Sequence, residues 1–163
     1  MNQPTQATVV LLRDHEGKIC LAQKKQPIHH AAGEISYSLG TWNGYGGKKE
    51  TTDLTIEDTA VRELTDESGV VASKQDLVTC GHVFFFWPKN SGTVADMEVF
   101  FYFLDVWQGI PEEGSEMGAP QFFVTDEIPY EKMIGGDKVL LPKIDLLPIY
   151  PHQNNNILCI LSR

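Results

Sequence analysis

Three acidic residues lie close together near the middle of the chain, at Glu63, Asp66 and Glu67. On a helix, Glu63 and Glu67 are four residues apart and share one face, and Asp66 flanks them. Carboxylates at this spacing repel one another, and a hard divalent cation such as Mg²⁺ or Mn²⁺ removes the repulsion. An ion of this kind neutralises phosphate charge and orients or activates a water molecule. The three residues therefore predict a metal site suited to phosphate chemistry.

A helix must hold these residues, and the sequence predicts one over residues 55–68. Thr55 and Asp58 have nearly the pattern of a capping box at its start, and Gly69 supplies a stop. An apolar stripe follows the helix, formed by Ile56, Ala60 and Leu64. Because Glu63 is seven residues past Ile56, the glutamate row borders this stripe. We therefore expect the acids to face the protein body or a cleft.

A glycine-rich loop, residues 41–49 (TWNGYGGKK), precedes this helix. Its glycines allow the backbone to approach a ligand closely and to offer N–H groups to it. Arg62 is placed to brace a carboxylate through a bidentate pair. The alternative interpretation is a solvated acidic helix face. The combination of glycine loop, Arg62–Glu63 pair, inward acids and glycine stop favours the metal site.

The rest of the chain predicts the layers that support this helix. Apolar and β-branched runs predict strands at residues 7–12, 19–23, 77–87, 98–107, 121–125 and 157–161. Residues 27–39 are predicted to be irregular. A second helix is expected within 138–147, where Pro142 limits it to a first turn or breaks it. This order of elements predicts an α+β fold with one main sheet between helices.

Length, charge and cysteine content narrow the class of protein. The 163 residues predict a single domain, 1–163. A net charge of −9 disfavours stable binding of DNA or RNA, and the longest apolar runs are too short to span a membrane. The three cysteines are far apart and form no CxxC pair, which favours a reducing cytoplasm. We expect a cytoplasmic protein without nucleic-acid or membrane partners, as a monomer or homodimer.

The acidic helix and its loop resemble the signature of the Nudix hydrolase superfamily, G-x5-E-x7-R-E-U-x-E-E-x-G-U, where U is aliphatic. The right half is matched by Arg62, Glu63, Leu64, Asp66, Glu67, Gly69 and Val70, with Asp66 in place of a glutamate. The left half carries one extra residue between Gly47 and Arg62. The first acid of the signature is therefore either Asp53 or absent, depending on the direction of counting.

The stretches TWNGYGGK and TIEDTAVRELTDESG, the downstream strand pair and the Glu116–Met117 pair extend the resemblance over roughly residues 7–161. They resemble the MutT-related subfamily that hydrolyses oxidised purine nucleoside triphosphates. The resemblance implies an α/β/α sandwich around a mixed sheet, with Mg²⁺ (Mn²⁺ being possible) as cofactor. It implies a small-molecule nucleotide substrate cleaved at a phosphoanhydride bond to the monophosphate and pyrophosphate.

Roles for individual residues follow from the same resemblance. The metal would be held by Glu63, Asp66, Glu67, Glu116 and the Gly47 position, and Glu67 would also orient or deprotonate the attacking water. Arg62 would support these acids as part of the catalytic set. The substrate would be bound by Lys24 at phosphate, by Asn43 and Asp137 at the polar edges of the base, and by Phe85 and Met117 at its faces.

Two positions depart from the subfamily's base site. A tryptophan and the first of two adjacent aspartates are replaced by Ile134 and Gly136, which leaves the preference for oxidised purines open. A nucleoside-diphosphate-linked substrate such as ADP-ribose is the alternative within the enzyme class. A nucleotide-sensing module without catalysis is the alternative outside it, suggested by Asp66 and by the extra loop residue. Core packing remains the alternative for residues 84–87 (FFFW), of which Phe85 and Trp87 are the possible pocket walls.

Overall fold

The computed structural model describes residues 3–29, 35–36, 38–86, 95–144 and 158–162. Its helices and strands follow in the order β1 (Thr5–Arg13), β2 (Ile19–Gln23), β3 (Ile28–His29), β4 (Ile35–Ser36), β5 (Trp42–Asn43), α1 (Ile56–Ser68), β6 (Leu77–Phe86), β7 (Met97–Leu104), β8 (Gln121–Phe123), α2 (Gly135–Ile144) and β9 (Leu158–Ser162). Three short 3₁₀ turns are η1 (Lys74–Asp76), η2 (Thr125–Glu127) and η3 (Tyr130–Lys132).

The main sheet is mixed, and β1 lies near its centre. β1 runs antiparallel to β2 and parallel to β7, in a register that extends from Thr5 opposite Met97 to Leu12 opposite Leu104. β7 continues antiparallel to β6, and β9 runs parallel to β6. Within the described residues the strand order is β5-β2-β1-β7-β6-β9, with β8 also paired to β2. As on any β-strand, successive side chains of β1 point to opposite faces of this sheet.

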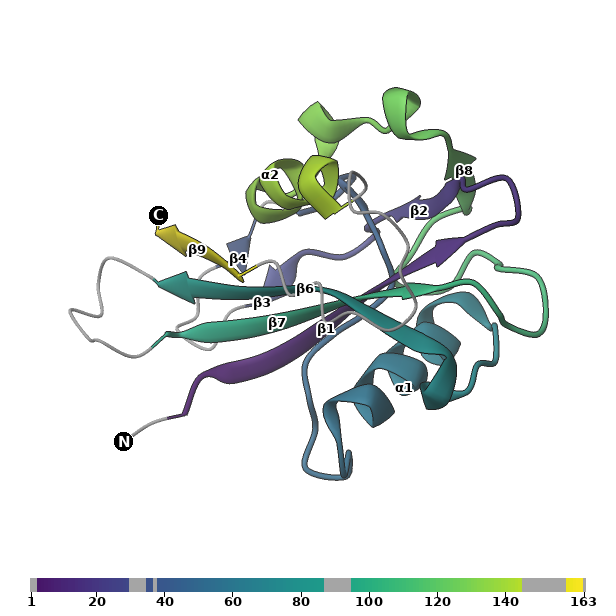
Figure 1. Ribbon diagram of the computed structural model, residues 1–163. Coiled ribbons are helices and arrows are strands. Elements are labelled where there is room, and N and C mark those ends of the chain that lie inside the picture. Colours follow the sequence, from purple (N-terminus) through teal and green to yellow (C-terminus); the bar gives the residue numbers. More distant parts are fainter. Residues whose placement is uncertain (1–2, 30–34, 37, 87–94, 145–157, 163) are drawn as a thin grey trace.

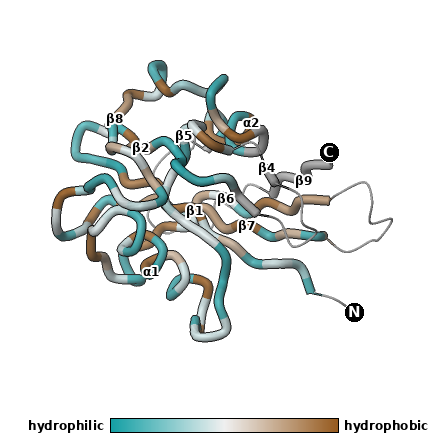
Figure 2. Tube along the Cα trace, turned by 180° about the vertical axis from the view of Figure 1, so that it is seen from behind, coloured by the Kyte–Doolittle hydropathy of each residue, from teal (hydrophilic) through white to brown (hydrophobic). Residues whose placement is uncertain are grey.

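Each face of the sheet is covered by one helix, with α1 below and α2 above in Figure 1. Val10 and Leu12 of β1 pack in the core between the sheet and α1. Val9 and Leu11 pack in the core on the α2 side. The most hydrophobic segments of the chain follow these central strands, as Figure 2 shows. The expected α/β/α sandwich around a mixed sheet is confirmed.

The helix α1 begins and ends where its sequence predicts. Thr55 is the N-cap: its side chain accepts from the Asp58 N–H, and the Asp58 carboxylate accepts from the Thr55 N–H. The capping box is therefore complete. Gly69 ends the helix in the left-handed region (φ 75°), which glycine adopts without a side-chain clash. Ala60 and Leu64 are fully buried against the sheet, so α1 is fixed in rotation about its axis.

The structure differs from the sequence-based expectation mainly at α2. This helix begins at Gly135, three residues earlier than predicted, and it continues through Pro142 to Ile144. Proline lacks the N–H that would bond the Lys138 carbonyl, but at this position it removes a bond only from the last turns. The segment 27–39, expected to be irregular, contains the short antiparallel pair β3–β4. The strand expected over 98–107 is β7, which ends at Leu104.

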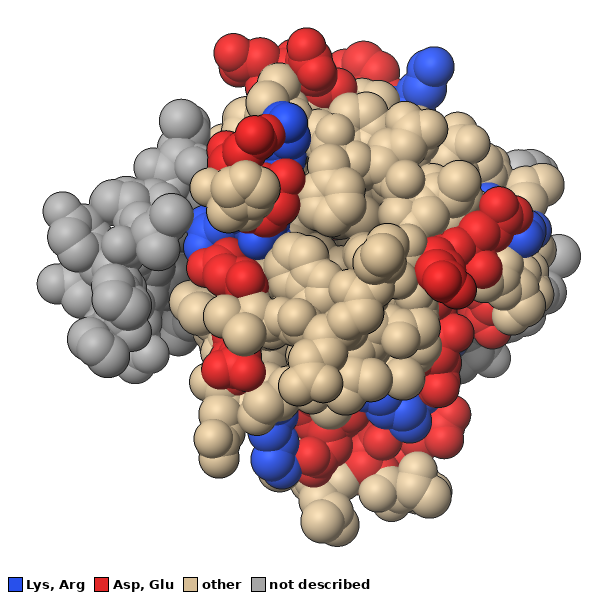
Figure 3. Space-filling view, turned by 90° about the vertical axis from the view of Figure 1, so that its right-hand side faces the viewer, with Lys and Arg blue, Asp and Glu red and all other residues tan. Residues whose placement is uncertain are grey.

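The surface reflects the acidic composition. On the face shown in Figure 3, Asp and Glu side chains lie mainly toward the edges and leave a largely uncharged centre. No helix in the described part of the chain is long and apolar enough to cross a bilayer. Cys20 and Cys80 are free thiols, and both are buried.

Candidate active site

The glycine-rich loop after β5 runs alongside β1. The Val10 N–H donates to the Tyr45 carbonyl (2.6 Å), and the Tyr45 N–H donates back to the Val10 carbonyl (3.0 Å). The Thr8 N–H donates to the Gly47 carbonyl (2.9 Å). A Cβ atom at Gly46 would collide with the backbone of Thr8. Only glycine allows the loop to lie this close to the strand.

The next glycine lets α1 approach the same loop. A Cβ atom at Gly47 would lie 2.5 Å from the carboxyl carbon of Glu63 and 2.6 and 2.7 Å from its two oxygens. The space that a side chain would fill is therefore taken by a carboxylate of the acidic helix. This arrangement brings the loop backbone and the helix acids to one place.

Arg62 ties the loop to the helix. Its Nε and Nη2 atoms donate to the two carboxylate oxygens of Asp53 (3.0 and 2.9 Å), which is a bidentate pair. Its Nη2 also donates to the Lys48 carbonyl (3.1 Å), and its Nη1 donates to Glu63 Oε1 (2.7 Å). Arg62 therefore braces Glu63 from a frame built on the loop.

Asp53 fills the place of the first acid of the sequence signature. It is buried, and besides Arg62 it accepts from the Glu50 N–H and the Thr59 hydroxyl, both at 2.9 Å. The Arg62 hydrogen bonds, followed by the Glu50 N–H, hold the pKa of the Asp53 carboxyl far below its usual value. The following residue, Leu54, is 89% exposed. Of the two alternatives left by the sequence, these contacts favour the first, in which Asp53 supports Arg62.

Glu67 is the most enclosed acid of α1, with only 4% of the residue exposed. Its Oε1 accepts from the Lys24 ammonium (3.2 Å), and its Oε2 accepts from the Gly46 N–H (2.7 Å). Burial raises the pKa of the Glu67 carboxyl, and the attraction of Lys24 opposes this rise. The carboxylate is therefore held at the junction of β2, the glycine loop and α1.

The other acids extend from Glu67 toward solvent. Burial raises the pKa of Glu63, Arg62 opposes that rise, and the charges of Asp66 and Glu116 add to it. The Asp66 side chain is 65% exposed. Glu116 is exposed on the loop between β7 and β8. The exposure of the four carboxylates thus increases from the buried Glu67, through Glu63, to the exposed Asp66 and Glu116.

These acids fit a hard divalent cation by their chemistry. In the described part of the chain, no three His, Cys, Asp or Glu side chains are close enough to hold an ion as they stand. Glu67 is turned toward Lys24, and Glu63 is turned toward Arg62. All four carboxylates nevertheless line one cavity together with Gly47, and burial raises the pKa of both Glu63 and Glu67. Carboxylate oxygens gathered at one cavity are the kind of ligand that Mg²⁺ or Mn²⁺ prefers.

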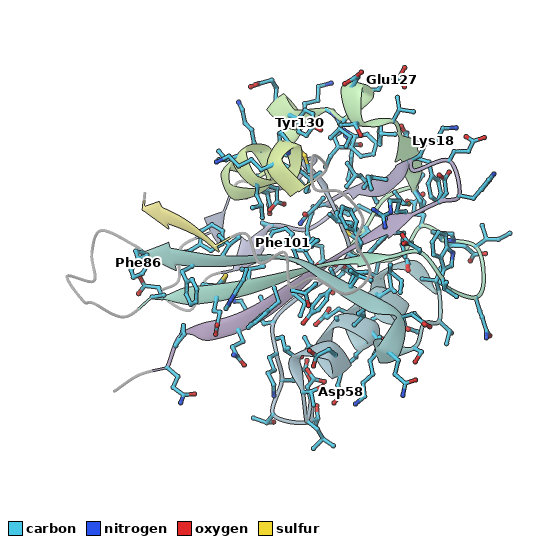
Figure 4. The ribbon with its side chains drawn as sticks, viewed as in Figure 1. Lys18, Asp58, Phe86, Phe101, Glu127 and Tyr130 are labelled. Atoms are coloured by element: carbon cyan, nitrogen blue, oxygen red, sulfur yellow. The ribbon has the colours of Figure 1, made fainter. Side chains whose placement is uncertain are left out.

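The cavity has a volume of about 640 Å³ and continues from the acids to the α2 side of the sheet. That end is mainly apolar, with walls formed by Phe85, Met97, Val99, Phe101 and Ile134. Figure 4 shows Phe101 near the middle of the sheet and Phe86, which also lines the cavity, toward the end of β6. An acidic end and an apolar end in one cavity suit a ligand with a charged group and a flat or apolar group.

Three buried polar groups line this cavity. Asn43 Oδ1 and Thr8 Oγ1 are buried and have no hydrogen-bond partner within the described residues. Asp137 is buried, and burial raises the pKa of its carboxyl to about 7, against the opposing effect of Lys24. A carboxyl with this pKa is partly protonated near neutrality and can then donate a hydrogen bond. Buried groups without partners are suited to the polar edge of a ligand.

The structure brings together most of the residues that the sequence singled out. The cavity is lined by Lys24, Asn43, Gly47, Arg62, Glu63, Asp66, Glu67, Phe85, Glu116 and Asp137. Met117 is not among the lining residues. It is wholly buried in the core between the sheet and α1, where its backbone forms an isolated β-bridge with Lys24. The methionine at the apolar end is Met97, which no local sequence pattern singles out. Trp87 lies outside the described residues.

Comparison with known proteins identifies the family. A model of the NUDIX domain matches residues 3–144. The chain belongs to the Nudix family. The oxidized purine nucleoside triphosphate hydrolase of Danio rerio is 34% identical over 126 residues, which cover 77% of this chain and 70% of that protein. The enzyme of the same name from Mus musculus is 38% identical over 106 residues, covering 65% of this chain and 64% of that one.

Solved structures agree with the Nudix fold. A NUDIX hydrolase from Nitrosomonas europaea has a TM-score of 0.71 at 14% identity, covering all of this chain and 81% of its own. A MutT protein from Bacillus halodurans has a TM-score of 0.69 at 20% identity, covering 97% and 89%. The acidic helix of this Nudix hydrolase lies within the segment that the family model covers.

Proposed function

We propose that this Nudix hydrolase cleaves a purine nucleoside triphosphate, with an oxidised purine as its base, to the nucleoside monophosphate and pyrophosphate. The observation that carries the proposal is the single cavity, in which a carboxylate cluster and an apolar chamber with buried polar groups form two ends of one space. A triphosphate with its metal fits the first end, and a purine fits the second. The names of the relatives from Danio rerio and Mus musculus support the same substrate class.

Mg²⁺, or Mn²⁺ in its place, would be held by Glu63, Asp66, Glu67, Glu116 and the Gly47 backbone. When bound, such an ion neutralises phosphate charge and lowers the pKa of a bound water. Arg62, fixed by its bidentate contact with Asp53, keeps the Glu63 carboxylate in position.

Glu67 is the proposed base that orients or deprotonates the attacking water. It is the acid best held in place, since both of its oxygens are hydrogen-bonded, and burial makes it a better proton acceptor than an exposed glutamate. The proton of the water passes to the Glu67 carboxylate as the oxygen attacks phosphorus. Pyrophosphate leaves as the phosphoanhydride bond breaks.

The base would be bound at the α2 side of the sheet. Asn43 and Asp137 would hydrogen-bond its polar edge, and Phe85 with Met97 would contact its faces. Ile134 would take the stacking position with an aliphatic side chain. We leave Met117 out of this proposed set because it is fully buried in the core on the α1 side. The free, buried thiols Cys20 and Cys80 suit the reducing cytoplasm in which such a nucleotide enzyme would act.

A substrate panel tests the proposal. Pyrophosphate release would be measured with Mg²⁺ and with 8-oxo-dGTP, 2-hydroxy-dATP and dGTP, beside ADP-ribose, for which the monophosphate product would be followed. We expect the highest kcat/KM for an oxidised purine triphosphate. A higher value for ADP-ribose would refute the substrate class, and no turnover of any of the four would indicate a sensing module.

A further inference from the structure

The Lys24–Glu67 ion pair is the most enclosed contact between opposite charges in the described part of the site. Only 10% of the Lys24 side chain and 4% of the Glu67 side chain are exposed. The backbone of Lys24 is fixed on both sides, since its N–H donates to the Thr41 carbonyl (2.9 Å) and its carbonyl accepts from the Gly40 N–H (2.7 Å). The ammonium group therefore projects toward the Glu67 carboxylate from a rigid position.

Glu67 needs such a partner when no metal is bound. A buried carboxylate without a compensating charge is strongly destabilising. The need for a positive partner is greater because Glu63, which carries the same charge, raises the pKa of Glu67 further. Besides Lys24, its other hydrogen-bond donor among the described residues is a single backbone N–H at Gly46. Lys24 thus supplies the positive charge that Glu67 needs in the metal-free protein.

We propose that Lys24 is an internal counter-ion that competes with the metal for Glu67 and is released to the substrate's phosphate when the metal binds. The inference rests on the proposed function, in which Glu67 is a metal ligand. Two cations on one carboxylate repel each other, and the repulsion is strong where water is largely excluded. Binding of the metal to Glu67 therefore weakens the Lys24 contact. The freed ammonium lies in the same cavity and meets the phosphates of the nucleotide.

This arrangement positions Glu67 before the metal arrives and lowers the affinity for the metal alone. The substrate restores that affinity, because its phosphates accept the displaced ammonium. Metal and nucleotide consequently bind with positive coupling. A purely structural lysine would stabilise the fold equally with and without metal.

Binding of Mn²⁺ alone tests the proposal without relying on turnover. Free Mn²⁺ would be measured by electron paramagnetic resonance at pH 8, so that protonation of an unpaired Glu67 does not mask the effect. We expect Lys24→Met to bind Mn²⁺ at least about threefold more tightly than the wild type, because a competing charge is removed. Its melting temperature should be lower without metal and should rise more on adding Mn²⁺. Equal or weaker binding overturns the proposal.

The matched control is Lys74→Met, which removes a half-exposed lysine paired with Asp58, away from the cavity. Its Mn²⁺ affinity should equal that of the wild type. If Lys24→Met does not fold, Lys24→Gln keeps a donor for Glu67 without the charge and should still bind Mn²⁺ more tightly.

In the wild type, acetylation of the Lys24 amine, followed by mass spectrometry with Lys74 as the reference, should increase with Mg²⁺. An unchanged rate contradicts the release of Lys24. Tighter Mn²⁺ binding by the variants combined with no turnover of any nucleotide would reject the proposed function alone.

Discussion

Replacement of Asp137 by asparagine should change how stability depends on pH. Burial raises the pKa of the Asp137 carboxyl from 3.8 to about 7. As the pH rises from about 4 to about 7, the unfolded chain loses this proton while the folded chain keeps it. The free energy of unfolding therefore falls across that window and is constant above it, as far as this group is concerned. Since one pKa unit corresponds to 1.36 kcal/mol, the total is on the order of 4 kcal/mol.

An asparagine side chain carries no charge at any of these pH values, so Asp137→Asn removes this loss. Urea denaturation of both proteins between pH 4.5 and 8.5, without metal, gives the difference in their free energies of unfolding. We expect this difference to move in favour of the variant as the pH rises, and to level off above about pH 7. Asp126→Asn, at an exposed position of η2, is the control and is measured over the same pH range. A flat difference for Asp137→Asn would refute the reasoning, because it would mean that the native carboxyl titrates as it does in the unfolded chain.

Four further substitutions test the site and the core beside it. Asp53→Asn removes the bidentate partner of Arg62. We expect kcat/KM to fall by roughly tenfold or more, as it does for other residues that orient metal ligands. Steady-state kinetics with Mg²⁺ would measure this fall in kcat/KM. Ile134→Trp adds an aromatic surface to the cavity wall and should lower the KM for a purine substrate by at least about fivefold; a KM that stays the same would place the base elsewhere. Met117→Ala should cost about 2–5 kcal/mol of stability because it empties a fully buried position, whereas Met97→Ala should mainly raise the KM. Urea denaturation and substrate kinetics on the same pair separate the two effects, and the opposite pattern would contradict the assignment of the two methionines.

The parts of this molecule that local sequence determines were predictable. The capping box at Thr55 and the stop at Gly69 depend on residues that are close together in the chain, and both are present as expected. Because a helix has a fixed period, the position of Glu63 and Glu67 beside the apolar stripe followed as well. The closeness of Gly46 and Gly47 to other atoms was indicated by the glycines themselves.

What was missed depends on contacts between distant segments. Asp53 and Leu54 are neighbours, and only the position of Arg62 in space shows which of them joins the brace. Met97 lies opposite Thr5 in the parallel pairing of β1 and β7, and Met117 is buried where it bridges to Lys24; no local pattern reveals either pairing. The Lys24–Glu67 pair joins residues 43 positions apart, so its role as a counter-ion was not visible in the sequence. The early start of α2 was hidden by two glycines, which are poor helix formers.

The most direct test of the central claim is the turnover of Glu67→Gln. This substitution keeps the size of the side chain and an acceptor oxygen, but removes the carboxylate that would bind metal and accept the proton of water. Pyrophosphate release from the best substrate of the panel, with Mg²⁺, should fall at least about a hundredfold, while circular dichroism shows an intact fold. Turnover within a few-fold of the wild type would contradict the account, since hydrolysis would then not depend on the acid at the centre of the site.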